Sequence, residues 1–282
     1  MFVASTQKRI GRGSYRADYV ISRDVFVATI RRTGLTFDSR FVPPPKAYPD
    51  GVLLYVLLQG ALELNGERFD APAAVCFDVR QFEGTVPFRN WGEPLAALEI
   101  RVDSTEHFLA GAPRPCSIEL SDDSWASARR LARRPTNEGA VVELIRSLAD
   151  QQLLAADLAH GLSETRSRHH RIFEAVRPFA ERLDLLNTLD AVSLTAGLSL
   201  RHLNRELGEF ARSFQVPFVG WRETTKRLRI KLAVLALSEP EVSIADIARL
   251  AGYGSTAAMK RAFHDAGIPA PSQVREMLLR KP

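Results

Sequence analysis

The stretch Ser243–Phe263 reads SIADIARLAGYGSTAAMKRAF and predicts two short helices joined by a tight turn. Ser243 and Asp246 have the spacing of a capping box, so we expect the first helix to begin there. Gly252 supplies a residue that tolerates a positive φ at the helix end, and Ser255 then caps a second helix. Such a pair is either ordinary helix packing or a helix-turn-helix unit, whose second helix lies in a DNA major groove.

A related pattern lies upstream in residues 189–207, LDAVSLTAGLSLRHLNREL. Gly197 again follows an apolar-periodic segment, and Ser199 again precedes a helix with an inward leucine stripe. The segment Trp221–Leu237 between the two copies contains neither Gly nor Pro, which predicts a rigid connecting helix. Two reading helices joined in this way fit successive major-groove segments separated by about 34 Å. The duplication therefore favours DNA binding over mere packing.

Polar side chains remain on the outer face of the second helix in each unit. Arg pairs well with guanine and Asn with adenine, so we expect the first unit to read bases. Ala257 offers only a methyl group and Lys260 a phosphate contact, so the second unit should contribute more to positioning. The alternative for Arg205 and Arg261 is an ion pair within the domain. The candidate DNA-binding residues are Arg201, His202, Asn204, Arg205, Thr256, Ala257, Lys260 and Arg261.

The formal charge of +5 is concentrated in the C-terminal part of the chain. Residues 168–282 contain 18 Lys and Arg against 12 Asp and Glu, whereas residues 1–167 contain 20 against 21. A basic excess beside a helix-turn-helix pattern is typical of phosphate binding.

Residues from about 168 to 280 resemble the DNA-binding domain of the AraC/XylS family of bacterial transcription regulators. The most specific matches are Ser243–Phe263 with the following Pro271 and Arg275, and SLRHLNREL with Pro217. The resemblance implies an all-helical domain with two helix-turn-helix units, in which the second helix of each unit enters the major groove. The family's base-facing positions correspond to Arg201, Asn204, Arg205, Thr256, Ala257 and Arg261.

The N-terminal half predicts β-structure from about residue 18 to 103. Short runs with apolar alternation are separated by turn signals, and Asn65-Gly66 is the strongest of these. Many such strands predict a sandwich or barrel. This half resembles, more weakly, the cupin-like barrel that precedes the DNA-binding domain in many AraC-type regulators, where it binds an effector or mediates dimerisation.

A cupin enzyme needs several His ligands for its metal, and no His precedes His107. The sequence also contains no GxxxxGK[ST] loop and no CxxC motif. We therefore expect no enzyme activity, no cofactor and no metal. Cys76 and Cys116 lie in no metal or redox motif and are expected to be buried free thiols, with a disulfide as the alternative. Gly11-Arg12-Gly13 is expected to be a flexible basic segment.

The barrel is either filled by its own side chains or holds one small molecule. In the first case the aromatic residues belong to the core of the barrel and the arginines are solvated. In the second case the aromatic residues line a ligand site and the arginines are polar anchors for the ligand. The candidate effector-binding residues are Tyr55, Phe77, Arg80, Phe82, Arg89 and Trp91.

The predicted fold class is multidomain α+β, with a cupin-like β-barrel and helices in residues 1–162. Residues 163–170 are the predicted linker, and residues 171–282 the all-α domain with two helix-turn-helix units. An apolar stripe either packs on the barrel or pairs with a second chain. The stripe consists of Val141, Leu144, Ile145, Leu148, Leu154 and Leu158.

We expect a sequence-specific transcription regulator, controlled by a small-molecule effector or partner at the barrel. The alternative is a ligand-independent architectural or accessory DNA-binding protein. Expected partners are double-stranded promoter DNA, a second copy in a homodimer and RNA polymerase. No apolar run reaches the roughly 18 residues of a membrane span and no signal peptide is evident, so we expect a cytoplasmic, nucleoid-associated protein without membrane contact.

Overall fold

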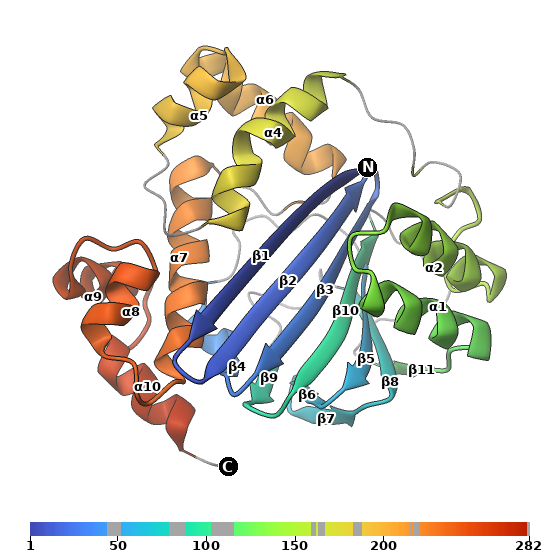
Figure 1. The fold of residues 1–282 in the computed structure, drawn as a ribbon, viewed down its shortest axis with the longest axis horizontal. Helices are drawn as coiled ribbons and strands as arrows, with labels where there is room; N and C mark the ends of the chain where they lie inside the picture. The colour runs from blue at the N-terminus through green and yellow to red at the C-terminus, as the bar shows by residue number, and fades with distance from the viewer. Residues whose placement is uncertain are drawn as a thin grey trace.

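The structure is a computed structural model in which strands occupy the N-terminal part of the chain and helices the remainder (Figure 1). It describes residues 1–43, 52–78, 88–102, 116–158, 162, 167–182, 188–214, 216 and 220–280. The strands are β1 (Phe2–Ile10), β2 (Gly13–Ser22), β3 (Val25–Thr33), β4 (Thr36–Asp38), β5 (Val52–Gln59), β6 (Ala61–Leu64), β7 (Glu67–Asp70), β8 (Ala73–Asp78), β9 (Phe88–Trp91), β10 (Leu95–Val102) and β11 (Cys116–Ile118). The helices are the short η1 (Ser39–Phe41), α1 (Asp122–Arg133), α2 (Glu138–Asp150), α4 (Ser167–Glu181), α5 (Leu189–Ala196), α6 (Leu200–Ser213), α7 (Trp221–Leu237), α8 (Ile244–Leu250), α9 (Thr256–His264) and α10 (Pro271–Leu279).

The α+β class and its order along the chain are confirmed, but the β-region is not a closed barrel. In the residues described, the strands form a seven-stranded antiparallel sheet, β1-β2-β3-β10-β5-β8-β11, and a four-stranded sheet, β4-β9-β6-β7. The edge strand β1 of the large sheet packs against α4, where Thr6 donates a hydrogen bond to the carbonyl of Glu181. The hairpin predicted at Asn65-Gly66 joins β6 to β7, and both residues have a positive φ.

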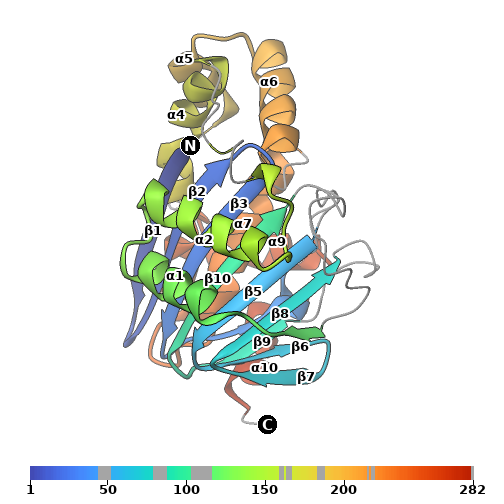
Figure 2. The ribbon, with the colours of Figure 1, turned by 90° about the vertical axis from the view of Figure 1, so that its right-hand side faces the viewer.

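The two faces of the large sheet pack against different helices (Figure 2). Alternate residues such as Val27, Leu54 and Ile100 face α1 and α2. The predicted apolar stripe lies in this layer and is buried there, so it packs on the sheet of its own chain. The opposite face packs against the C-terminal helices through residues such as Phe26 and Ile30.

Both predicted helix pairs are present with the expected caps. Ser243 accepts a hydrogen bond from the backbone N–H of Asp246 at 3.1 Å, and Ser255 accepts one from Ala258 at 3.1 Å. In the upstream copy Ser199 caps α6, and Gly197 ends α5 with φ +62°. The pairs α5–α6 and α8–α9 are therefore helix-turn-helix units, with α7 between them.

The junction between sheet and helices differs in three details from the sequence analysis. The β-structure begins at Phe2, and residues 11 and 12 form the turn into β2, which begins at Gly13, instead of a flexible basic segment. Helix α4 begins at Ser167, within the predicted linker. His169 of this helix is 8% exposed and packs edge-on against Phe214, with ring centroids 5.0 Å apart.

Candidate nucleic-acid interface and ligand pocket

The outer faces of α6 and α9 present the predicted DNA-binding residues to solvent. On α6 the side chains of Arg201, His202, Asn204 and Arg205 are exposed. On α9, Ala257, Lys260 and Arg261 are exposed, and Thr256 is partly exposed. Each helix therefore carries a polar surface that is free to meet a partner.

The inner faces of the same helices fix them in place. Leu203 and Leu207 of α6 and Met259 and Phe263 of α9 are all at most 4% exposed. Arg275 of α10 donates a hydrogen bond to the carbonyl of Val242, which lies just before α8, so α10 supports the second unit.

Among the described residues, no distant partner holds Arg205 or Arg261 within the domain. The guanidinium of Arg205 is 3.3 Å from the carboxylate of the adjacent Glu206, and its side chain is 66% exposed. Arg261 makes no ion pair with any residue that the structure describes. Both side chains are therefore available to a ligand, because an exposed pair of neighbouring residues contributes little free energy.

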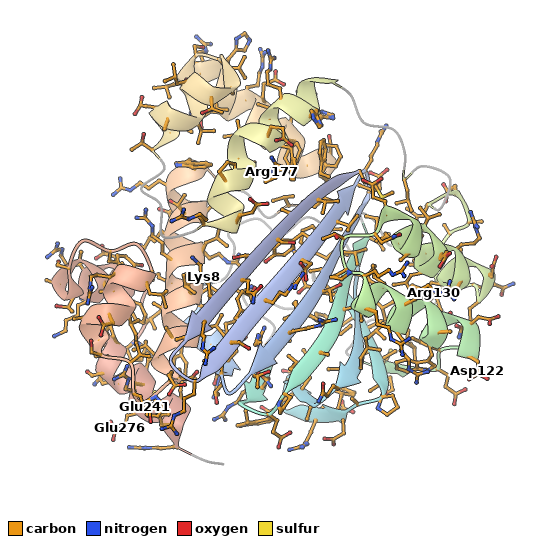
Figure 3. All side chains as sticks on the ribbon, in the orientation of Figure 1. Lys8, Asp122, Arg130, Arg177, Glu241 and Glu276 are labelled. Atoms are coloured by element: carbon orange, nitrogen blue, oxygen red, sulfur yellow. The ribbon has the colours of Figure 1, made fainter. Side chains whose placement is uncertain are left out.

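The N-terminal sheet contacts both helix-turn-helix units. Phe2 of β1 packs on Phe210 of α6 and on Phe214, the residue that follows α6, with ring centroids 5.6 and 5.1 Å apart. At the other end of β1, the turn to β2 meets the α7–α8 connection, where Arg12 pairs with Glu241 at 2.7 Å. Figure 3 labels Glu241 beside the tip of this hairpin. The sheet thus contacts the end of the first unit and the segment that leads into the second.

A pocket lies between the large sheet, the small sheet and α7. Its empty volume is about 730 Å³, including the open mouth. The walls combine apolar side chains with a cluster of charged groups that come from both the sheet and α7. The lining residues are Ile30, Arg32, Phe37, Ser39, Val42, Leu53, Tyr55, Leu64, Phe77, Phe88, Glu99, Arg101, Arg227 and Lys231.

The acid in this pocket, Glu99, is already bound by its neighbours. Arg101 donates from Nε to one carboxylate oxygen at 2.6 Å, and Tyr55 donates to the other at 3.1 Å. Burial alone raises the pKa of Glu99, but the charges of Arg101 and Lys231 and these hydrogen bonds bring the pKa below its ordinary value. Glu99 is therefore a carboxylate, and it balances only part of the positive charge around it.

Two cations in the pocket, Arg32 and Lys231, are only partly balanced by the charge of Glu99. Arg32 is 3% exposed, and its Nε and Nη1 atoms are buried without a hydrogen-bond partner in the described residues. Its guanidinium stacks on Phe37, 4.6 Å from the ring centroid. Burial lowers the pKa of Lys231 to about 7, and the nearby charge of Arg227 acts in the same direction. Both groups would gain from an anion in the pocket.

The predicted effector residues are only partly brought together. Tyr55 of β5 and Phe77 of β8 line the pocket. Arg89 and Trp91 of β9 lie outside its lining, where the Arg89 guanidinium is 3.7 Å from the carboxylate of Asp38 and stacks on Trp91. Arg80 and Phe82 lie outside the described residues.

The charged pocket residues were missed by the sequence analysis. The sequence does contain a sign of them, which is a charged residue inside an apolar segment. Glu99 lies within LAALEIRV, and Lys231 lies within RIKLAVLAL. A charge on a buried face needs a partner, but the sequence does not show which strand or helix supplies it.

Across the described ranges, no group of three or more His, Cys, Asp and Glu residues is placed to hold a metal ion. None of the described helices combines the length and apolarity needed to cross a membrane.

Comparison with known proteins gives weak matches to solved structures alone. No family model and no curated protein matches the chain. ToxT from Vibrio cholerae matches with a TM-score of 0.38 and 11% identity, over 92% of this chain and 100% of ToxT. ToxT with a bound unsaturated fatty acid matches at 0.34 and 12%, over 96% and 97% of the two chains. The AraC-like transcriptional activator CuxR matches at 0.32 and 12%, over 81% and 85%.

A β-region precedes a helical region with two helix-turn-helix units, as the sequence predicted. Because the scores and identities are low, we base the proposed function on the residues of this chain.

Proposed function

We propose that this protein is a sequence-specific DNA-binding transcription regulator. The observation that carries the proposal is the pair of helix-turn-helix units, each with an exposed polar outer face on its second helix. The basic excess of residues 168–282 supports it, because phosphate contacts supply much of the affinity for DNA.

Within this proposal, the first unit reads bases and the second mainly positions the protein. Arg201 and Arg205 can each donate two hydrogen bonds to guanine, and Asn204 can pair with adenine. On α9 only Arg261 has comparable capacity, while Thr256 and Ala257 offer a hydroxyl and a methyl group. His202 and Lys260 then contact the sugar-phosphate backbone.

We further propose that a small anion with an apolar body binds in the pocket and controls DNA binding. The buried guanidinium of Arg32 and the ammonium of Lys231 supply the anion site, and Phe37, Phe77 and Phe88 surround the apolar part. A carboxylate fits this chemistry because guanidinium groups bind it with strong, charge-assisted hydrogen bonds.

The position of the pocket gives a route from ligand to DNA. Arg227 and Lys231 belong to α7, which connects the two units, whereas Arg32 belongs to the sheet. A ligand held by both parts favours the arrangement in which they are close, and so changes the population of DNA-binding states. Homodimer formation and contact with RNA polymerase stay predictions.

The decisive experiment selects bound fragments from the source genome and then titrates one selected site with and without candidate anions. We expect one recurring sequence motif and an affinity that changes when a suitable anion is present. Enrichment without any motif would instead support the alternative, an architectural DNA-binding protein. If a motif is found but no anion changes the affinity of the protein for it, the proposal of a transcription regulator stands and the proposal of an anionic effector is wrong.

A further inference from the structure

The two cysteines face each other across an antiparallel strand pair. Cys116 on β11 lies directly opposite Cys76 on β8, and their Sγ atoms are 3.4 Å apart. Directly opposed residues in such a pair have Cα atoms about 4.5 or 5.5 Å apart, and both separations suit a disulfide. Their side chains also point to the same face of the sheet. The sulfur atoms can therefore reach bonding distance with a small local movement.

The two thiols differ in their access to solvent. Cys116 is exposed on the edge strand, whereas Cys76 is fully buried. Burial raises the pKa of the Cys76 thiol, so Cys76 alone is a poor target for oxidants. Cys116 is the sulfur that a dissolved oxidant meets first.

We propose that Cys76 and Cys116 form a reversible disulfide when a hydroperoxide oxidises Cys116. The Cys116 thiolate attacks the peroxide oxygen, an S–O bond forms, the O–O bond breaks, and the departing oxygen leaves as water or an alcohol. The Cys76 sulfur then gives up its proton and attacks the resulting sulfenic acid. The S–S bond forms as the S–O bond breaks, and water leaves. Two thiols lose two electrons, which reduce the peroxide.

The position of this bond separates it from the proposed ligand pocket. Cys76 packs in the layer with α1 and α2, whereas its neighbour Phe77 points to the opposite face and lines the pocket. Strand β11 leads directly into α1. The disulfide would therefore link the edge strand β11, which precedes α1, to its neighbour β8.

The test uses the full chain, which contains only two cysteines. Reduced protein is treated with hydrogen peroxide, and the free thiols are counted by alkylation after denaturation. We expect both thiols to disappear at the same rate and the mass of the protein to fall by two hydrogens. Digestion should yield a linked Cys76–Cys116 peptide, and dithiothreitol should restore both thiols. The rate should not depend on protein concentration, because the bond forms within one chain.

The matched control swaps two adjacent residues in the double variant Cys116→Ser/Ser117→Cys. Ser117 lies opposite Val75 and is exposed, so this variant keeps the composition but places the thiol in the neighbouring register position. We expect no link to Cys76 in the variant. A disulfide between two chains, equal linking in the swapped variant, or unchanged thiols in the wild type would overturn the proposal.

Discussion

The side chain of Glu239 accepts a hydrogen bond from the backbone N–H of Gly13, at 3.2 Å. The same carboxylate oxygen accepts a second bond from the N–H of Arg12, also at 3.2 Å. Glu239 follows α7 and is 4% exposed, so this contact joins the N-terminal hairpin to the connection between the two helix-turn-helix units. It leaves no room for a side chain at Gly11, where a Cβ atom would lie 2.5 Å from Cγ of Glu239.

Replacing Glu239 should loosen this junction. Glu239→Ala leaves two backbone donors without their acceptor, so we expect the free energy of unfolding to fall by about 2 kcal/mol in urea titrations. Glu241→Ala is the matched control: it removes only the exposed pair with Arg12, which should cost less than about 1 kcal/mol. If both variants lose the same free energy of unfolding, the buried contact of Glu239 stabilises the protein no more than the exposed ion pair of Glu241.

Replacing one arginine of α6 should separate base reading from phosphate binding. Arg205→Ala is expected to reduce the preference for a selected site over scrambled DNA by roughly 1 to 3 kcal/mol. Lys260→Ala should weaken both complexes about equally. It should also reduce the slope of log affinity against log salt concentration by about one. Fluorescence anisotropy at several salt concentrations measures both quantities. Arg280→Ala, at the end of α10, is the control and should change neither.

Replacing Arg32 should abolish anion binding without destabilising the protein. Arg32→Met removes a buried charge that has unpaired nitrogen atoms, so we expect unfolding at the same or a higher temperature. Calorimetric titration with decanoate and naphthoate, and with their uncharged amides, measures binding. Arg31→Met, the exposed neighbour on β3, should bind like the wild type. A strong fall in stability of the Arg32 variant would indicate a structural role instead.

The partly buried ammonium of Lys231 should make stability depend on pH. Its pKa is about 7 in the folded protein and about 10.4 in an unfolded chain. Between these values the unfolded chain binds a proton that the folded chain has released, so the free energy of unfolding should rise from pH 7 to about pH 10. Arg227, Arg32 and Arg101 oppose the charge of Lys231, and Glu99 favours it.

Lys231→Met should remove that part of the rise and should be more stable than the wild type near pH 7. Urea titrations at intervals from pH 6.5 to about pH 10 measure the difference between the two proteins. Lys226→Met, on the same helix but outside the pocket lining, serves as the control. If the free energy of unfolding changes with pH in the same way in the wild type and in Lys231→Met, the lowered pKa of Lys231 is contradicted.

The sequence by itself determined the features that depend on near neighbours. Ser243, Ser255 and Ser199 cap helices because their side chains reach amides only three residues away. Gly197 and Asn65-Gly66 mark turns because they tolerate a positive φ. These local rules predicted both helix-turn-helix units and the exposed faces of α6 and α9.

Only the tertiary structure decided which distant segments meet. Alternation in the strands predicts that the sheet has two faces. The packing of the whole chain decides that the sheet is open, that α1 and α2 cover one face, and that α7 lies near the other. Arg32 and Lys231 come from opposite parts of the sequence, and no local pattern brings them to one pocket. The physical reason is that caps and turns need only neighbouring hydrogen bonds, whereas buried charges and sheet edges are placed by contacts across the fold.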